Sequence, residues 1–186
     1  MNETIQTILS RRSMRSYEPT PVEREKINVI LQCAQFAPSG MNRQPWHFTV
    51  VTNRKLLDKI SAENKKILLQ SPDEATRARA LDPGFDNFRG APMAIIVSGE
   101  ATGRNTMADC ANAMENMALA ATCLGLGSCY IASFRMAMEQ PEGAFLLDEL
   151  QIPPDFIPMF ALALGYGNEV LGPRATRREN TITFIE

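Results

Sequence analysis

One segment, residues 105–125, restricts how this chain can fold more than any other. It is rich in alanine and methionine and predicts a long helix. Its apolar residues lie on one side (Ala108, Ala111, Met114, Ala118 and Ala121) and also elsewhere (Met117, Leu119 and Leu124). A helix that is apolar nearly all round must be buried on most sides. A chain of 186 residues forms about one domain, with little interior to surround a helix about 30 Å long. We therefore expect an obligate dimer.

Composition excludes several classes of protein. Lys and Arg number 19 against 21 Asp and Glu, a net charge of -2, whereas nucleic-acid binders carry a positive excess. Asp109, Asn112 and Glu115 interrupt the most apolar run, so no membrane helix is expected. The first residues lack the pattern of a secretory signal, which favours a cytoplasmic protein.

Metal chemistry is not expected either. The four cysteines, which form no C-x-x-C pair, are Cys33, Cys110, Cys123 and Cys129. His47 is the only histidine, so a zinc site lacks ligands, and we assign this residue a structural role. The cysteines are interpreted as reduced thiols of the core.

Hydrophobic periodicity outlines one α/β or α+β domain over residues 1–186. Besides 105–125, helices are expected at 3–12 and after a cap at Asn53. Another is expected from Pro21 to Ala37, where Thr20 is the cap and Glu23 closes a capping box. Strands are expected at 46–52, 93–98, 128–132 and 158–164. Residues 71–90 are polar and broken by proline and glycine, so they predict a loop or lid, and residues 168–186 form a C-terminal extension.

Two basic clusters suggest an anion site. The first is Arg11-Arg12-Ser13-x-Arg15, in which guanidinium groups and a hydroxyl suit phosphate oxygens. The second is the tail segment 173–178, which includes Arg174, Arg177 and Arg178. The alternatives are a solvated basic patch at the end of a helix and a solvated terminus.

Two further segments carry polar groups or glycines at turns. The segment 37–46 (APSGMNRQPW) joins a helix to a strand and offers Ser39, Asn42 and Gln44 to a heteroaromatic ring, or is an ordinary loop. Gly125-Leu126-Gly127 follows a helix and lacks a third glycine, so a Rossmann dinucleotide fold is not expected.

Taken together, these motifs resemble the nitroreductase family of FMN-dependent oxidoreductases. The order matches over nearly the whole chain: R-R-S-x-R, then A-P-S-G-x-N-x-Q-P-W, Gly90-Ala91-Pro92, the D-C-A-x-A-x-E-N helix with G-L-G-S-C, and a basic tail. The resemblance is to the shorter members. It implies an α+β fold with a central, mostly antiparallel sheet flanked by helices, in a domain-swapped homodimer with FMN at the interface.

The resemblance also implies cofactor-binding residues. The segment matching the FMN phosphate and ribityl site contains Arg11, Arg12, Ser13 and Arg15. The segment that the partner chain brings to the flavin contains Pro38, Ser39, Gly40 and Asn42. The segment near the isoalloxazine contains Ile131, Ala132 and Ser133, and the basic tail near the phosphate contains Arg177 and Arg178. Larger members carry an acidic residue before a glycine near flavin N5, where this chain has Ala132-Ser133.

The implied activity is reduction of a nitroaromatic or quinone-like small molecule by NADH or NADPH, in a ping-pong, two-electron mechanism. The flavin carries the chemistry, so no side chain is assigned as catalytic acid or base. One alternative is a non-reductase flavoenzyme of the same fold that fragments flavin, removes halogen or oxidises a ring. The other is a non-catalytic FMN-binding redox module.

Overall fold

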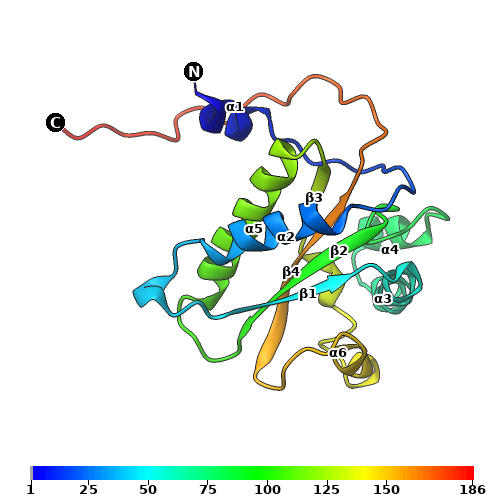
Figure 1. Cartoon of the computed structure of the whole chain (residues 1–186). Coiled ribbons are helices and arrows are strands. Elements are labelled where there is room, and N and C mark those ends of the chain that lie inside the picture. The colour runs from blue at the N-terminus through cyan, green and yellow to red at the C-terminus, as the bar shows by residue number, and fades with distance from the viewer. Residues whose placement is uncertain (1) are drawn as a thin grey trace.

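The computed structural model describes residues 2–186, and its elements follow the predicted order (Figure 1). The strands are β1 (Trp46–Val51), β2 (Met93–Glu100), β3 (Gly127–Ile131) and β4 (Phe156–Gly165). The α-helices are α1 (Glu3–Ser10), α2 (Arg24–Gln35), α3 (Arg54–Leu69), α4 (Glu74–Leu81), α5 (Thr106–Cys123) and α6 (Phe145–Glu149). Short 3-10 turns are η1 (Gly40–Asn42), η2 (Ser133–Arg135) and η3 (Pro141–Gly143).

The four strands form one antiparallel sheet in the order β1-β2-β4-β3. The two central strands are apolar along their length, as expected when both faces of a sheet are covered. Side chains alternate between the faces, so Ile95 of β2 and Leu162 of β4 pack with α2 and α5. Ile96 and Ala161 pack on the opposite face with α3 and α6. The fold is thus the expected α+β domain, with a helical layer on each face.

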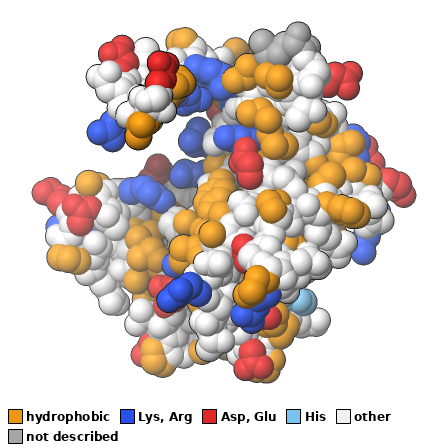
Figure 2. Space-filling model, turned by 90° about the vertical axis from the view of Figure 1, so that its left-hand side faces the viewer, with side chains coloured by type: hydrophobic (Ala, Val, Ile, Leu, Met, Phe, Trp, Pro, Cys, Tyr) orange, Lys and Arg blue, Asp and Glu red, His pale blue; other side chains and the backbone are white. Residues whose placement is uncertain are grey.

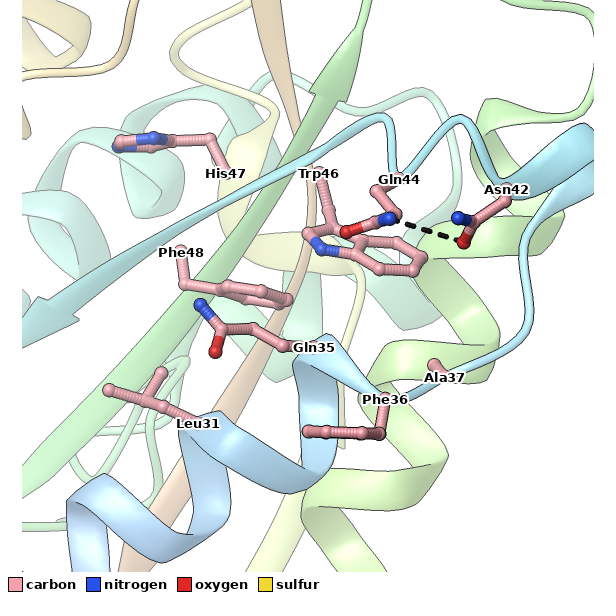
Figure 3. A pocket seen from close by; sticks show the side chains of 9 residues that line it. All are labelled: Leu31, Gln35, Phe36, Ala37, Asn42, Gln44, Trp46, His47 and Phe48. Atoms are coloured by element: carbon pink, nitrogen blue, oxygen red, sulfur yellow. Dashed lines mark hydrogen bonds between the residues drawn. The ribbon is translucent and has the colours of Figure 1, made fainter.

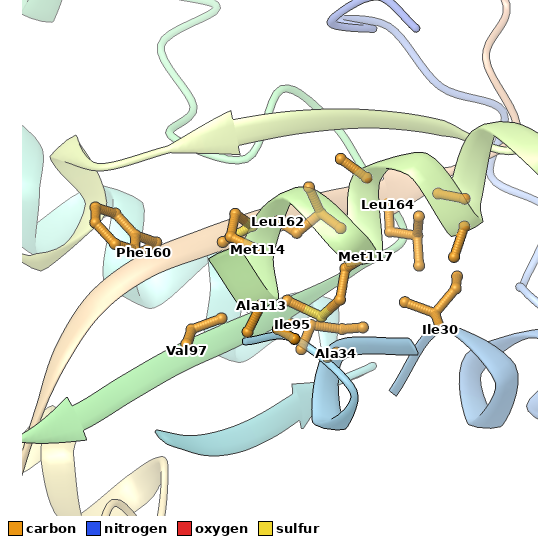
Figure 4. Close-up of a cluster of buried hydrophobic side chains, with 14 of the residues drawn as sticks. Ile30, Ala34, Ile95, Val97, Ala113, Met114, Met117, Phe160, Leu162 and Leu164 are labelled. Carbon is orange, nitrogen blue, oxygen red and sulfur yellow. The ribbon is translucent and has the colours of Figure 1, made fainter. Parts of the chain in front are cut away.

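The first face contains the core cluster shown in Figure 4. Met114 and Met117 of α5 are fully buried between the sheet and Ile30 of α2. One stripe of α5 remains open, and it includes Ala108, Asn112, Glu115 and Cys123. Of the apolar residues on which the expected dimer rests, only Ala108 is exposed, and the others are buried or half-buried within the described chain. The dimer therefore stays a prediction.

The second predicted helix begins later than expected. It starts at Arg24, with Glu23 at the capping position and no side-chain cap bond within the described chain. The predicted Thr20–Glu23 capping box is therefore wrong. The carboxylate of Glu23 instead accepts a hydrogen bond from the Tyr166 hydroxyl at 2.7 Å. These residues are far apart in the chain, so the local sequence does not predict this contact. The helix also ends at Gln35, before the expected Ala37.

Residues 71–90 are not a continuous loop. Asp73 caps α4 by accepting a hydrogen bond from the Thr76 amide at 2.8 Å, and Ala80 and Phe88 are fully buried. The expectation of a loop is therefore wrong over residues 74–81, where a capping aspartate starts a polar helix. A role of this segment as a lid stays a prediction. Across residues 2–186, no helix combines the length and apolarity that crossing a membrane requires.

The C-terminal extension lies apart from the sheet. After β4 the chain runs back past α1, and the final residues project from the body (Figure 1). Ile182, Phe184 and Ile185 are 75%, 85% and 95% exposed, although their side chains are strongly apolar. Ile5, Ile8 and Leu9 of α1 are also exposed. Residues 2–186 of a single chain leave these apolar surfaces uncovered.

Candidate functional site

The first arginine cluster is fixed beside the start of β3. The amide of Met14 donates to the carbonyl of Ser128 at 2.8 Å, and Ser13 forms a β-bridge with Ser128. The Tyr17 hydroxyl donates to the Met14 carbonyl at 2.8 Å, which closes the turn. Burial raises the pKa of Tyr17 well above its usual value, so the hydroxyl stays a donor. These bonds hold the segment 11–15 across one end of the sheet.

The second cluster comes back to meet the first from the tail. Arg12 donates to the Gly172 carbonyl, and Arg174 donates to the Arg11 carbonyl at 3.0 Å. The Arg15 amide donates to the carboxylate of Glu169. Together the two segments enclose a cavity of about 230 Å³ lined by Arg11, Arg12, Ser13, Arg15, Arg174, Ala175 and Arg177. Figure 2 shows a hollow bordered by Lys and Arg side chains on the face from which the tail projects.

The arginine cavity has an excess of positive charge. Five arginines line it, whereas the nearby carboxylates are those of Glu115, 3.2 Å from Arg11 Nε, and Glu169. The Nε atom of Arg11 is buried, and the Glu115 carboxylate is its ion-pair partner. Grouped guanidinium groups repel one another unless an anion lies among them. The structure thus brings together most of the predicted basic residues, adds Arg174 from the three tail candidates, and leaves Arg178 outside the lining.

The predicted segment 131–133 follows the other end of β3. Ile131 is buried, Ala132 is exposed, and Ser133 begins η2. The buried Asn87 lies behind it, with its amide nitrogen 3.4 Å from both the hydroxyl and the carbonyl oxygen of Ser133. Ala132 is four residues beyond Ser128 in the chain, a span of about 13 Å in an extended strand. An elongated ligand can therefore reach from the arginine cavity to this segment along the edge strand.

The predicted segment 38–42 lies elsewhere in the single chain. It leads into β1, and β1 and β3 are the opposite edges of the sheet, about 14 Å apart at ordinary strand spacing. Met41, Asn42 and Gln44 have φ angles of 53°, 55° and 51°, in the left-handed region that costs free energy for residues other than glycine. The structure therefore does not bring this segment together with residues 131–133.

Two residues of α5 hold the 38–42 loop in place. The Gly40 amide donates to Asp109 Oδ1 at 3.1 Å, and Asn112 Nδ2 donates to the Pro38 carbonyl at 3.2 Å. In the sequence, Asp109 and Asn112 stand out only as interruptions of an apolar run. Because they are three residues apart on an otherwise apolar helix, they lie on one face of it, and this spacing could have predicted that they contact the same loop.

A cavity of about 900 Å³ lies between α2 and the edge strand β1 (Figure 3). Trp46 and Phe48 face Leu31 and the end of α2, whereas His47 points to the other side of the strand. The His47 ring meets Phe156 edge-on, with centroids 5.9 Å apart. This cavity has a mixed lining, since Gln35, Asn42 and Gln44 border it as well as the aromatic rings. It adjoins the edge of β1 that is unpaired within residues 2–186 and is separate from the arginine cavity.

The thiols are only partly as expected. Cys110 and Cys129 are buried, but Cys123 is exposed and Cys33 is half-buried, so the assignment of all four to the core is wrong. Burial, followed by the nearby charge of Asp109, raises the pKa of Cys110 to about 12. Burial also raises the pKa of Cys129. Neither buried thiol is a thiolate at neutral pH, so neither is a nucleophile.

Comparison with known proteins gives consistent matches. The Nitroreductase family model matches residues 8–166. A nitroreductase from Bacteroides fragilis, whose crystal structure has bound FMN, is 35% identical with a TM-score of 0.92, and each chain is covered completely. A BluB-like flavoprotein from Clostridium difficile is 27% identical with a TM-score of 0.80, again over both whole chains. The FMN reductase (NADPH) of Bacillus subtilis is 27% identical over 97% of this chain and 75% of its own.

Proposed function

Because the chain belongs to the nitroreductase family, we propose that it binds FMN and reduces a small electron acceptor with NADH or NADPH. One observation carries this proposal. Two arginine segments, joined by a hydrogen bond between residues 160 positions apart, line one cavity beside the edge strand β3. The similar protein from Bacteroides fragilis has bound FMN, and the Bacillus subtilis relative is an FMN reductase, which supports the same cofactor here.

The arginine cavity suits a phosphate group. The lining side chains that can donate hydrogen bonds are five arginines and Ser13. A guanidinium group can donate two parallel hydrogen bonds to two oxygens of one phosphate. The Nε of Arg11 lies 3.2 Å from the Glu115 carboxylate, so an anion would be bound by the terminal nitrogens of this guanidinium group. We assign the FMN phosphate to Arg11, Arg12, Ser13, Arg15 and a tail arginine, with Arg174 and Arg177 favoured over Arg178 because they line the cavity.

FMN supplies the two-electron chemistry, and the protein positions the reactants. Residues Ile131, Ala132 and Ser133 lie along β3 from the phosphate site, so we assign them to the edge of the flavin ring. An exposed Ala132 leaves this end of the strand open to a small molecule. We propose that the donor and then a nitroaromatic or quinone-like acceptor occupy this open face in turn, which gives ping-pong kinetics.

We propose that a second copy completes the site. Within one chain the loop 38–42 lies at the opposite edge of the sheet from residues 131–133, so Pro38, Ser39, Gly40 and Asn42 reach a flavin only on another chain. Asp109 and Asn112 hold this strained loop in one conformation, as a contact across an interface requires. The open stripe of α5 and the exposed apolar residues of α1 are the surface that such a partner covers.

We propose that the C-terminal tail is the segment that the two copies exchange. Residues 181–185 (TITFI) combine β-branched and aromatic residues, are exposed, and have the composition of a strand. The outer edge of β1 is unpaired within the described chain and adjoins the 900 Å³ cavity, into which Trp46 and Phe48 face. We assign the tail of one copy to this edge of the other, which adds a strand and covers exposed apolar surface.

The first test uses the purified, intact chain. We expect a yellow protein with a flavin spectrum that NADH or NADPH bleaches without oxygen, and whose colour returns on adding a quinone or nitroaromatic. A colourless protein that fails to take up added FMN refutes the proposal. Rapid steady-state consumption of NAD(P)H with quinones separates this function from a non-catalytic FMN module.

The exchange of the tail is tested by removing residues 181–186. We expect the full chain to have the mass of two copies by light scattering at low micromolar concentration. The truncated chain should dissociate at concentrations at which the full chain does not, because exposed apolar edges lose their cover. Equal dissociation constants for the two chains would contradict this assignment.

The similarity to a BluB-like flavoprotein favours one second candidate, a non-reductase flavoenzyme of the same fold. Flavin fragmentation, dehalogenation or ring oxidation belong to this class. Turnover distinguishes this candidate from the proposed reductase. If NAD(P)H reduces the bound flavin but no electrons pass to quinones or nitroaromatics, the chain is a non-reductase flavoenzyme. Product analysis of FMN after aerobic reduction then identifies flavin fragmentation.

A further inference from the structure

The edge strand β3 exposes one aromatic ring. Cys129 and Ile131 of this strand are buried on the face covered by α3 and α6. Tyr130 points to the opposite face, because it pairs with Leu162, which packs toward α5. Its side chain is 44% exposed. Because β3 is an edge strand, the ring of Tyr130 remains accessible to a ligand although helices cover most of this face of the sheet.

The ring of Tyr130 is backed by the core. The centroid of Phe160 lies 5.0 Å from that of Tyr130, with the planes 43° apart, and Phe160 is buried. A ring that is supported on one side and free on the other is a stacking surface with little freedom to lose on binding.

Tyr130 lies midway between the two ends of the proposed FMN site. Ser128, which holds the phosphate-binding segment, is two residues before it, and Ala132 is two residues after it. Each step is about 7 Å in an extended strand. A ligand that spans from the arginine cavity to Ala132 along this edge passes the exposed ring.

We propose that Tyr130 is a stacking residue for the isoalloxazine ring of FMN, which lies against the free face of the phenol. This inference rests on the proposed function, since it requires FMN in that site. Stacked aromatic rings stabilise each other beyond the area they bury. Burial raises the pKa of Tyr130 to about 12, so the phenol stays neutral and does not repel a reduced, anionic flavin.

Three substitutions separate stacking from packing. An excited flavin accepts an electron from a touching phenol or indole but not from a phenyl or alkyl group. We therefore expect Tyr130→Trp to keep both FMN affinity and the quenched fluorescence of bound FMN. Tyr130→Phe should keep the affinity within about 2-fold but raise the fluorescence. Tyr130→Leu should raise the fluorescence and weaken FMN binding about 3- to 10-fold.

The measurements are the fluorescence yield of bound FMN, its dissociation constant and the chain mass by light scattering. Tyr166→Leu is the matched control, because Tyr166 contacts Glu23 and Lys26 at a different place, and it should keep the wild-type fluorescence. Wild-type fluorescence and affinity in all three Tyr130 variants overturn the inference. A change of mass in Tyr130→Leu with unchanged fluorescence also overturns it, since Tyr130 then contacts the partner. Wild-type protein that binds no FMN refutes the proposed function and this inference together.

Discussion

Two charged clusters in this molecule have opposite characters. Around Asp86 opposite charges are paired: Arg54 contacts Asp86 and Asp58 at 2.6 Å, and Ser61 and the amides of Phe88 and Gly90 donate to Asp86. Around the arginine cavity five guanidinium groups face few carboxylates. The Asp86 cluster ties α3 to the turn at residues 86–90 and is complete within one chain. The arginine cluster is electrostatically complete only with an added anion.

The difference separates a structural ion cluster from a ligand site. A half-buried carboxylate with several donors stabilises the fold, and removing it leaves those donors unpaired. Grouped cations destabilise the empty protein slightly and are neutralised when a ligand binds. The two clusters should therefore respond in opposite ways to mutation: one through the free energy of unfolding, the other through the affinity for FMN.

The largest effect is expected for Arg11→Ala combined with Arg15→Ala. Each lost charge-assisted hydrogen bond contributes about 1.5–3 kcal/mol, so FMN binding should weaken by about 3–6 kcal/mol, more than 100-fold. The urea midpoint without FMN should stay or rise slightly, because mutual repulsion is relieved. Titration followed by flavin fluorescence measures the affinity, and Arg79→Ala on the exposed face of α4 is the control. Unchanged affinity would place the phosphate elsewhere.

The next effect is expected for Asp86→Ala. The substitution leaves Ser61 and two backbone amides without their acceptor and removes one of the two carboxylates that Arg54 contacts, so unfolding should become about 3 kcal/mol easier. Urea unfolding without FMN measures this change. The FMN dissociation constant of the folded fraction should match that of the wild type. A large loss of FMN affinity with little change in stability would erase the contrast between the two clusters.

A smaller effect is expected from pH. Burial opposes ionisation of Asp86, but the amides of Gly90 and Phe88, with Ser61 and Arg54, outweigh it and hold its pKa below the usual value. Folding therefore favours the carboxylate. Its contribution to stability is fully present above the unfolded pKa of about 3.9 and is lost as the pH falls through the lower folded value. Urea midpoints should fall less steeply with acid in Asp86→Asn than in the wild type. Equal slopes would refute this role.

Much of the fold follows from local sequence pattern. The four strands lie within two residues of their predicted ranges, because each is a short apolar run bounded by turn residues. Asn53 caps α3 as predicted, through its own side chain. The errors have physical causes: Glu23 accepts a hydrogen bond from Tyr166 instead of closing a capping box with Thr20, and the polar composition of residues 74–81 hid the helix that Asp73 caps.

By itself, the sequence determined the α+β class, the long apolar helix, and the family whose motifs the chain carries. It also identified two basic segments as anion-binding candidates, because residue type alone sets charge. Only the tertiary structure decided that these segments meet in one cavity, that Arg174 and Arg177 line it, and that residues 38–42 lie at the far edge of the sheet. Such outcomes depend on strand order and on contacts between residues distant in sequence, which local periodicity does not encode.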